Sequence, residues 1–222
     1  MPLKLSGIIQ ASLPITHFKT MPQLMEEVVW EEEIGNSRVL REPVGVVAAI
    51  TPWNFPISLI VVKAIPALLA GNTLVAKPAP TTPLATLRLA EIFNEVLPPG
   101  VFNIIVDNND LGAALTSHPD VAKVSFTGST STGKKVMASA AGSLKRVTLE
   151  LGGNDAAIVL DDVDPKAVAK QLFEGAMVNS GQVCLAIKRA FVPASKYDAI
   201  CAELASLAES AVVGDGMKPD TQ

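Results

Sequence analysis

The residue best suited to covalent chemistry is Cys184, which ends the polar, glycine-containing segment NSGQVC. A thiol in such a loop is within reach of a substrate, and its thiolate is a strong nucleophile. A Cys-His hydrolase also needs an imidazole, but His17 and His118 both lie outside the candidate site segments. A carboxylate base is therefore the better partner. Cys201 has helical spacing with apolar neighbours and is predicted to be a small buried residue.

Two further side chains could assist a thiolate. Glu150 ends the apolar segment RVTLE and precedes LGGN. A carboxylate at the end of a buried strand is costly unless it is paired or used, which suggests a general base; a partly exposed charge is the alternative. Asn54 lies between two prolines in TPWNFP. Its amide could donate to an oxyanion, or it could cap the following helix.

The segment FTGSTSTGKK at 126–135 is one residue away from the phosphate-loop pattern G-x-x-x-x-G-K-[ST]. Lys135 stands where that pattern needs a hydroxyl for Mg²⁺, so the match fails at a chemically strict position. Gly128 and Ser129 still open a helix after an apolar strand, and such a helix end suits a dinucleotide pyrophosphate. Simple capping by Ser129 and a nucleotide triphosphatase remain the alternatives.

Two lysines stand near these segments. Lys77 ends the strand TLVAK and could reach ribose hydroxyls or a phosphate, or lie on the surface. Lys63 interrupts an apolar helix. Its amine either extends to solvent or contacts the residues that form the site, without touching the ligand itself. The acidic residues Asp161, Asp162 and Asp164 precede Pro165 and suit a helix start, so no metal site is predicted.

The elements that must position these residues alternate from position 44 onward. Strands are expected at 44–51, 73–77, 102–106, 122–126, 146–150, 155–160 and 187–192. Helices are expected at 57–70, 83–97, 110–117, 130–141, 165–178 and 195–212. This rhythm predicts an α/β fold with a mainly parallel sheet, whose ligands bind beyond the carboxyl ends of the strands. Residues 26–41 suggest a β-ribbon turning at Gly35-Asn36, and the proline-punctuated residues 1–25 suggest an extended or poorly ordered lead-in.

Composition limits the class of protein. The chain has 222 residues, of which 49% are hydrophobic and 18% charged, with net charge −4, so we expect a folded core and no nucleic-acid partner. The apolar stretch 57–71 contains a lysine and a proline and is too short to span a bilayer. Two cysteines and the lack of a secretion signal suggest a reducing, cytoplasmic location.

Five motifs in order, TPWNFP, AGNTLVAKPA, FTGST, LELGGN and GQVC, resemble the NAD(P)-dependent aldehyde dehydrogenase superfamily from about residue 28 to the end. The resemblance implies oxidation of a small-molecule aldehyde to a carboxylic acid with NAD or NADP, through a thiohemiacetal and a thioester. It makes Cys184 the nucleophile, Glu150 the general base, and Asn54, with the backbone N–H of Cys184, the oxyanion hole.

The resemblance also implies a Rossmann-like cofactor domain at 26–151 and the start of a second α/β catalytic domain at 152–222. The chain would be about half of a family member, so either an enzyme or a non-catalytic nucleotide-binding or interaction fragment is possible. The ribbon at 26–41 suggests a homo-oligomer. The implied cofactor contacts are Trp53, Asn54, Lys77 and Pro80 (the last two near the adenosine ribose), Gly128 and Ser129 at the pyrophosphate, and Leu151 near the nicotinamide.

Two positions depart from the family pattern. Pro80 stands where many NAD-preferring relatives carry a glutamate that accepts from the ribose 2′-hydroxyl. Without that carboxylate, and with Thr81 and Thr82 as possible donors, we expect tolerance of the 2′-phosphate of NADP. Residues 107–110, DNND, replace a glycine-rich turn, but asparagine tolerates the left-handed backbone that such a turn needs.

Overall fold

The computed structural model describes all 222 residues, which divide into two units. The first unit is Gly7–Leu151, and the second combines Met1–Ser6 with Gly152–Gln222. None of the helices combines the length and the apolar character that a bilayer span requires.

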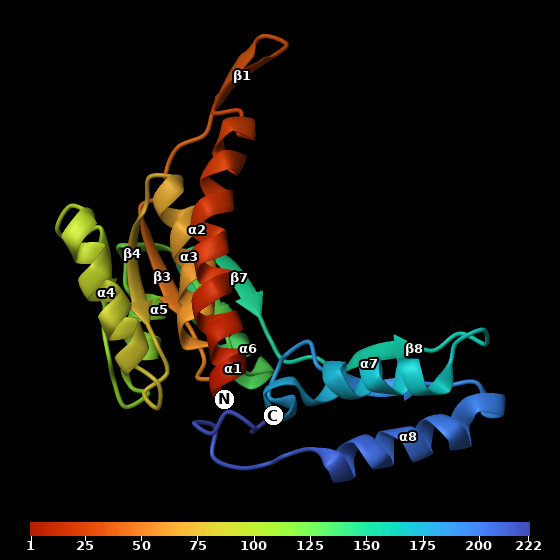
Figure 1. Ribbon diagram of the computed structural model, residues 1–222. Helices are drawn as coiled ribbons and strands as arrows, with labels where there is room; N and C mark the ends of the chain where they lie inside the picture. The colour runs from red at the N-terminus through yellow and green to blue at the C-terminus, as the bar shows by residue number, and fades with distance from the viewer. The chain divides into compact units, whose positions relative to one another are not determined.

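The first unit is built on a five-stranded sheet in which all neighbours are parallel, which confirms the fold class predicted from the sequence (Figure 1). The strand order is β5-β4-β3-β6-β7. The strands are β3 (Val46–Ile50), β4 (Thr73–Lys77), β5 (Phe102–Ile104), β6 (Val121–Thr127) and β7 (Arg146–Glu150). The central strand β3 is apolar on both faces because helices cover both sides of the sheet.

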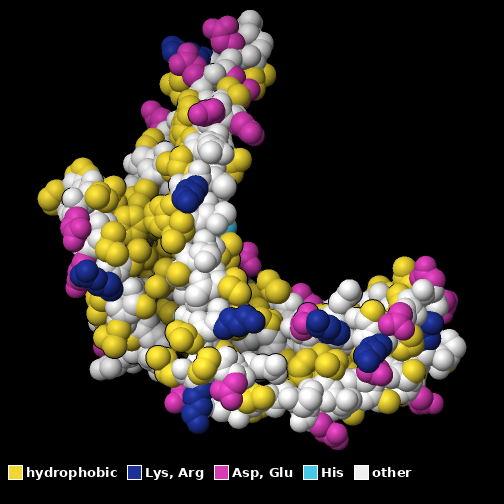
Figure 2. Space-filling model, viewed as in Figure 1, with side chains coloured by type: hydrophobic (Ala, Val, Ile, Leu, Met, Phe, Trp, Pro, Cys, Tyr) yellow, Lys and Arg dark blue, Asp and Glu magenta, His cyan; other side chains and the backbone are white.

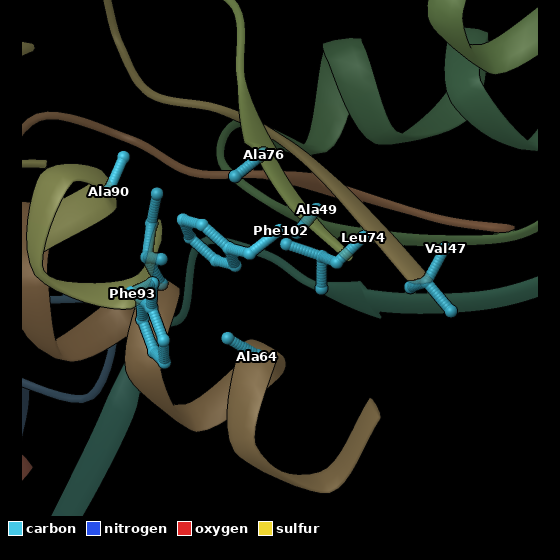
Figure 3. Packing of buried hydrophobic residues seen from close by; sticks show 9 residues of the cluster. Val47, Ala49, Ala64, Leu74, Ala76, Ala90, Phe93 and Phe102 are labelled. Atoms are coloured by element: carbon cyan, nitrogen blue, oxygen red, sulfur yellow. The ribbon is translucent and has the colours of Figure 1, made fainter. Parts of the chain in front are cut away.

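The two faces of β3 belong to different cores because successive strand residues point to opposite sides. Val47 and Ala49 pack with residues of α3 (Pro56–Leu69) and α4 (Leu84–Val96). Figure 3 shows this cluster, in which the rings of Phe93 and Phe102 stack with centroids 4.4 Å apart.

Ala48 and Ile50 form the opposite core with α5 (Leu111–Ser117) and α6 (Thr130–Ala141). Leu115 and Val136 are the buried residues that these two helices contribute. The four helices thus flank the sheet, two on each face.

The extended lead-in expected for residues 1–25 is wrong, because this segment is helical. A π-helical segment, η1 (Gly7–Ser12), leads into α2 (Leu13–Leu24) and the short 3₁₀ turn η2 (Met25–Glu27). Pro14 lies in the first turn of α2, where no intrahelical N–H is needed. The helix runs alongside α3 (Figure 1), and the Phe18 and Phe93 rings are 5.8 Å apart.

Contacts between the N-terminal segment and α3 explain why it is helical. Gln10 Oε1 accepts hydrogen bonds from the backbone nitrogens of Ile57 (2.9 Å) and Ser58 (3.1 Å), at the start of α3. Tertiary packing therefore stabilises a helix whose own prolines argue against it.

After η2 the chain forms an antiparallel hairpin of β1 (Glu31–Ile34) and β2 (Ser37–Leu40), turning at Gly35 with φ of 61°. Figure 2 shows acidic and basic side chains together on this hairpin. They include the ion pairs Arg38–Glu31 and Arg41–Glu32, the latter with a distance of 2.6 Å.

The second unit contains the parallel pair β8 (Asp155–Ile158) and β9 (Ile187–Phe191). Its helices are α1 (Leu3–Ser6), α7 (Pro165–Met177) and α8 (Tyr197–Ser210), with 3₁₀ turns at η3 (Val178–Gly181) and η4 (Ala194–Lys196). The buried core consists of Val159, Ala169, Leu172 and Ile200.

Two side chains of the second unit test expectations from the sequence. Asp164 caps α7, since its Oδ2 accepts from the backbone nitrogen of Ala167 at 2.8 Å, as expected for an acidic helix start. Cys201 is exposed, so its predicted burial is wrong. The side of α8 that faces the core is the one that carries Ile200, the buried residue of this helix. Cys201 is the next residue and lies on the exposed side.

Candidate active site

The carboxyl ends of the central strands bring four chain segments to one edge of the sheet. Ile50 pairs with Lys77 on one side and with Phe126 on the other. Beyond these pairs, the Thr51 nitrogen donates to the Lys77 carbonyl (3.1 Å) and the Gly128 nitrogen donates to the Glu150 carbonyl (3.0 Å). The loops after β3, β4 and β6 therefore begin side by side.

A groove of about 680 Å³ lies at this edge, between the loops and the helices α5 and α6. It spans the point between β3 and β6 where the strand order reverses, which is the usual ligand position in an open parallel sheet. Five of the cofactor residues named from the sequence line it: Trp53, Lys77, Pro80, Gly128 and Ser129. Asn54 and Leu151 lie outside its lining.

The start of α6 presents backbone N–H groups beside this groove. Ser129 Oγ accepts from the Thr132 nitrogen at 3.2 Å, so Ser129 caps the helix with its side chain. Capping occupies the Thr132 N–H but leaves those of Thr130 and Ser131 for a ligand, so the two interpretations of Ser129 are compatible. Gly128 is required by close packing, because a Cβ there would lie 2.5 Å from Phe126 Cζ.

Leu151 packs on the same helix. A Cβ at Gly133, in α6, would lie 2.5 Å from Leu151 Cδ2. The leucine side chain can therefore pack here only because residue 133 has no side chain. Leu151 also contacts the core formed by Ile50, Phe126 and Val136. The last residue of the first unit is thus anchored to the helix that borders the groove.

Lys77 is buried, which excludes the surface alternative. Its Nζ lies 2.6 Å from Asp107 Oδ1, and the two side chains are only 6% and 0% exposed. Sequence reasoning did not single out Asp107 as a site residue. The available signal was its position three residues after β5, the strand that neighbours β4, since adjacent parallel strands bring their carboxyl ends together.

Lys63 is also buried rather than extended to solvent. Its Nζ donates to Ser125 Oγ at 3.1 Å, between α3 and β6. Burial lowers the pKa of Lys63 from 10.5 to about 8; the charge of Glu150 raises this pKa and that of Lys123 lowers it further.

Glu150 and Asn54 belong to the first unit. Glu150 is exposed, which corrects the expectation of a buried strand end: β7 is an edge strand whose residues alternate between exposed and half-buried. Asn54 is half-buried in the segment between β3 and α3.

Cys184 belongs to the second unit and follows an unusual turn. Asn179, Ser180 and Gly181 have φ values of 51°, 57° and 74°, and such left-handed conformations cost energy in the first two residues. Cys184 itself is a free, half-buried thiol. Strained backbone of this kind is concentrated at functional sites, which agrees with the chemistry suggested for this loop.

Two contacts hold the Cys184 loop in place. Lys188 Nζ donates to the carbonyls of Val183 (3.1 Å), Cys184 (3.4 Å) and Ala186 (3.2 Å). A Cβ at Gly153 would lie 2.6 Å from the Cys184 carbonyl oxygen, so the LGGN motif passes directly beside the loop. Only glycine permits this approach.

Comparison with known proteins assigns the family. The model of the aldehyde dehydrogenase family matches residues 13–222. The chain belongs to the aldehyde dehydrogenase family. This assignment replaces the nucleotide triphosphatase that the segment 126–135 left open.

Among curated aldehyde dehydrogenase relatives, 3-succinoylsemialdehyde-pyridine dehydrogenase of a Pseudomonas species is 45% identical over 215 residues, covering 96% of this chain and 45% of the relative. A betaine aldehyde dehydrogenase of Vibrio vulnificus is 44% identical over 196 residues, covering 86% of this chain and 40% of the relative. The chain thus spans less than half the length of these relatives.

Solved structures, among them aldehyde dehydrogenases, have the same fold. The Mycobacterium tuberculosis enzyme complexed with NAD⁺ is 40% identical with a TM-score of 0.95, covering all of this chain and 47% of that one. A mutant aldehyde dehydrogenase C of Pseudomonas syringae, complexed with NAD⁺ and octanal, is 37% identical with a TM-score of 0.92 (96% and 44% covered). An NADP-dependent enzyme of Escherichia coli is 34% identical with a TM-score of 0.89 (98% and 49% covered).

Proposed function

We propose that this protein oxidises an aldehyde to a carboxylic acid with NAD(P)⁺ as the hydride acceptor, through a covalent intermediate on Cys184. The observation that carries the proposal is the groove at the carboxyl edge of the sheet, which gathers five residues expected to contact a dinucleotide. Membership of the aldehyde dehydrogenase family and likeness to enzymes complexed with NAD⁺ support it.

The chemistry of the groove fits a dinucleotide. Thr51 Oγ1 and Thr127 Oγ1 line it as buried hydroxyls without a hydrogen-bond partner, so a polar ligand would satisfy them. The N–H groups at the start of α6 suit the pyrophosphate, and Lys77 suits the adenosine ribose. Leu151 is proposed to contact the nicotinamide. When bound, the cofactor accepts the hydride that the substrate carbon loses.

The residues of the chain supply the remaining chemistry. The Cys184 thiolate forms a bond to the aldehyde carbon, and the carbonyl oxygen becomes an oxyanion. The side-chain amide of Asn54 and the backbone N–H of Cys184 donate to that oxyanion, each contributing about 3 kcal/mol in comparable sites.

Hydrolysis of the resulting thioester needs a base. Glu150 takes a proton from water, the hydroxide attacks the acyl carbon, and the C–S bond breaks to return the Cys184 thiolate. Because Glu150 is exposed, burial does not support this role, and the proposal of the role rests on membership of the aldehyde dehydrogenase family.

A non-catalytic nucleotide-binding protein is the second candidate, favoured by the groove, whose lining lies wholly within the first unit while Cys184 belongs to the second. We also propose a homo-oligomer formed through the exposed hairpin β1–β2, and a cytoplasmic location in which both thiols stay reduced.

The decisive experiment measures NADH formation under reducing conditions with octanal and with a short aldehyde, for the intact protein and for Cys184→Ser. The variant should lose activity by at least about a thousandfold. Cys201→Ser is the matched control, because it removes the other thiol from an exposed helix face and should leave the rate unchanged.

Full activity in Cys184→Ser would contradict the assigned nucleophile. A folded wild-type protein that binds the cofactor but forms no NADH with any aldehyde would instead favour the non-catalytic candidate.

A further inference from the structure

Lys77 and Asp107 form a buried ion pair next to the groove. Lys77 ends β4, and Asp107 follows the neighbouring strand β5, to which Ala76 and Ile104 are paired in register. The Lys77 Nζ to Asp107 Oδ1 distance is 2.6 Å. Asp107 Oδ2 also accepts from the Leu111 nitrogen at 2.9 Å, at the start of α5. The carboxylate is therefore held from two sides.

The pair is ionised and its charges cancel locally. Burial raises the pKa of Asp107, but the hydrogen bond from Lys77 and those from the backbone N–H groups of Leu111 and Asn109 outweigh it, so this pKa is lowered. A lysine standing alone here would attract a phosphate. Because the charge of Lys77 is already matched by Asp107, it offers a phosphate little net attraction.

The pair lies where the proposed function places the adenosine ribose. Lys77, Pro80, Asn109 and Gly112 all line the groove. A Cβ at Gly112 would lie 3.6 Å from Lys77 Cε, so the lysine stem runs beside the start of α5. Pro80 contributes no carboxylate to the groove, and the Asp107 carboxylate is buried against Lys77 without lining the groove itself.

We propose that the Lys77–Asp107 pair selects a cofactor whose adenosine ribose carries a free 2′-hydroxyl, so that NAD⁺ is preferred over NADP⁺. This inference rests on the proposed nucleotide site. The Asp107 side chain is fully buried and does not line the groove, so it acts through Lys77, which does. Lys77 can donate to a 2′-hydroxyl, but with its charge matched by Asp107 it gives little net attraction to a 2′-phosphate, which adds about −1.5 to −2 charges. The expectation of NADP tolerance rested on Pro80 and on Thr81 and Thr82 as possible donors, and the buried ion pair argues against it.

The test compares dissociation constants of NAD⁺ and NADP⁺ by isothermal titration calorimetry on the intact protein, without an aldehyde. The wild type should bind NADP⁺ at least about thirtyfold more weakly than NAD⁺. Asp107→Asn should lower the ratio of the NADP⁺ to the NAD⁺ dissociation constant by about tenfold or more. Without the Asp107 charge, the positive charge of Lys77 is no longer neutralised and attracts the 2′-phosphate of NADP⁺. NAD⁺ affinity should change by less than about fivefold.

Asp110→Asn is the matched control. Asp110 lies in the same loop and carries the same charge, but it is exposed and accepts a hydrogen bond only from the Asn108 nitrogen, at 3.3 Å. Its substitution should leave the NAD⁺/NADP⁺ ratio within about twofold of the wild type, since an exposed charge is screened by solvent.

Equal binding of the two cofactors by the wild type would overturn the selectivity, even if Asp107→Asn failed to fold. An unchanged ratio in a folded Asp107→Asn protein would overturn it as well. If neither cofactor bound to the folded wild type, the proposed nucleotide site would be contradicted, and the selectivity that rests on it would be contradicted as well.

Discussion

Lys63 Nζ donates a hydrogen bond to Ser125 Oγ over 3.1 Å, and both residues are buried between α3 and β6. Burial lowers the pKa of Lys63 to about 8, against the opposing influence of Glu150. A cationic lysine in this position therefore costs stability, and its cost depends on pH.

We predict that the free energy of unfolding rises with pH between about 8 and 10.5. In this window the unfolded chain still binds the Lys63 proton while the folded chain has released it, so folding is favoured as pH increases. The full change for this group is about 3 kcal/mol. Lys63→Met should flatten that rise and stabilise the protein by about 1–2 kcal/mol at pH 7.

Urea denaturation from pH 7 to 10 measures both effects. A Lys63→Met variant whose stability climbs with pH as steeply as the wild type would show that another group is responsible.

A second prediction concerns Gly153, whose added Cβ would meet the Cys184 carbonyl oxygen at 2.6 Å. Gly153→Ala should displace the Cys184 loop and lower aldehyde oxidation by at least about tenfold, since small misplacements of reacting groups are costly. NAD⁺ affinity should stay within about threefold of the wild type, because the groove lies in the first unit.

Gly152→Ala is the control for this substitution, because a Cβ there meets nothing within 4 Å. Steady-state rates and cofactor titrations of the two variants decide the outcome. Equal losses of activity in both would mean that the close approach to Cys184 is not what matters.

A third prediction concerns Gly128, at the start of the loop that borders the groove. In Gly128→Ala the new Cβ would lie 2.5 Å from Phe126 Cζ, a ring atom in a packed core that cannot move aside freely. The protein should lose about 1–3 kcal/mol of stability and bind NAD⁺ at least about tenfold more weakly.

Gly142→Ala, at the far end of the same helix α6, places its Cβ in open space and should change neither quantity appreciably. Thermal unfolding and calorimetric titration provide the readouts. Normal NAD⁺ binding by Gly128→Ala would argue against a role for this loop in holding the pyrophosphate.

The parallel sheet and its crossover helices could be predicted because their signals are local. Apolar β-branched segments such as VGVVAAIT alternate with helical periodicity, and α6 and β7 begin and end at the predicted residues. The motifs also identify Cys184, Glu150 and Asn54 as candidates, because residue types and their order along the chain carry the family resemblance.

Other features depend on contacts between segments that are distant in sequence, which only the tertiary structure decides. The helix α2 forms against α3 despite its prolines, and Cys201 is exposed because the core-facing side of α8 runs through Ile200. Glu150 is exposed because the strand order places β7 at the sheet edge.

The Lys77–Asp107 pair illustrates the same division. The sequence alone determines a lysine at one strand end and a carboxylate after another, thirty residues later. The strand order decides that these ends are neighbours, and burial between β4, β5 and α5 makes the two charges a pair. Periodicity reports which side of an element is apolar, whereas pairing depends on which elements lie next to each other in space.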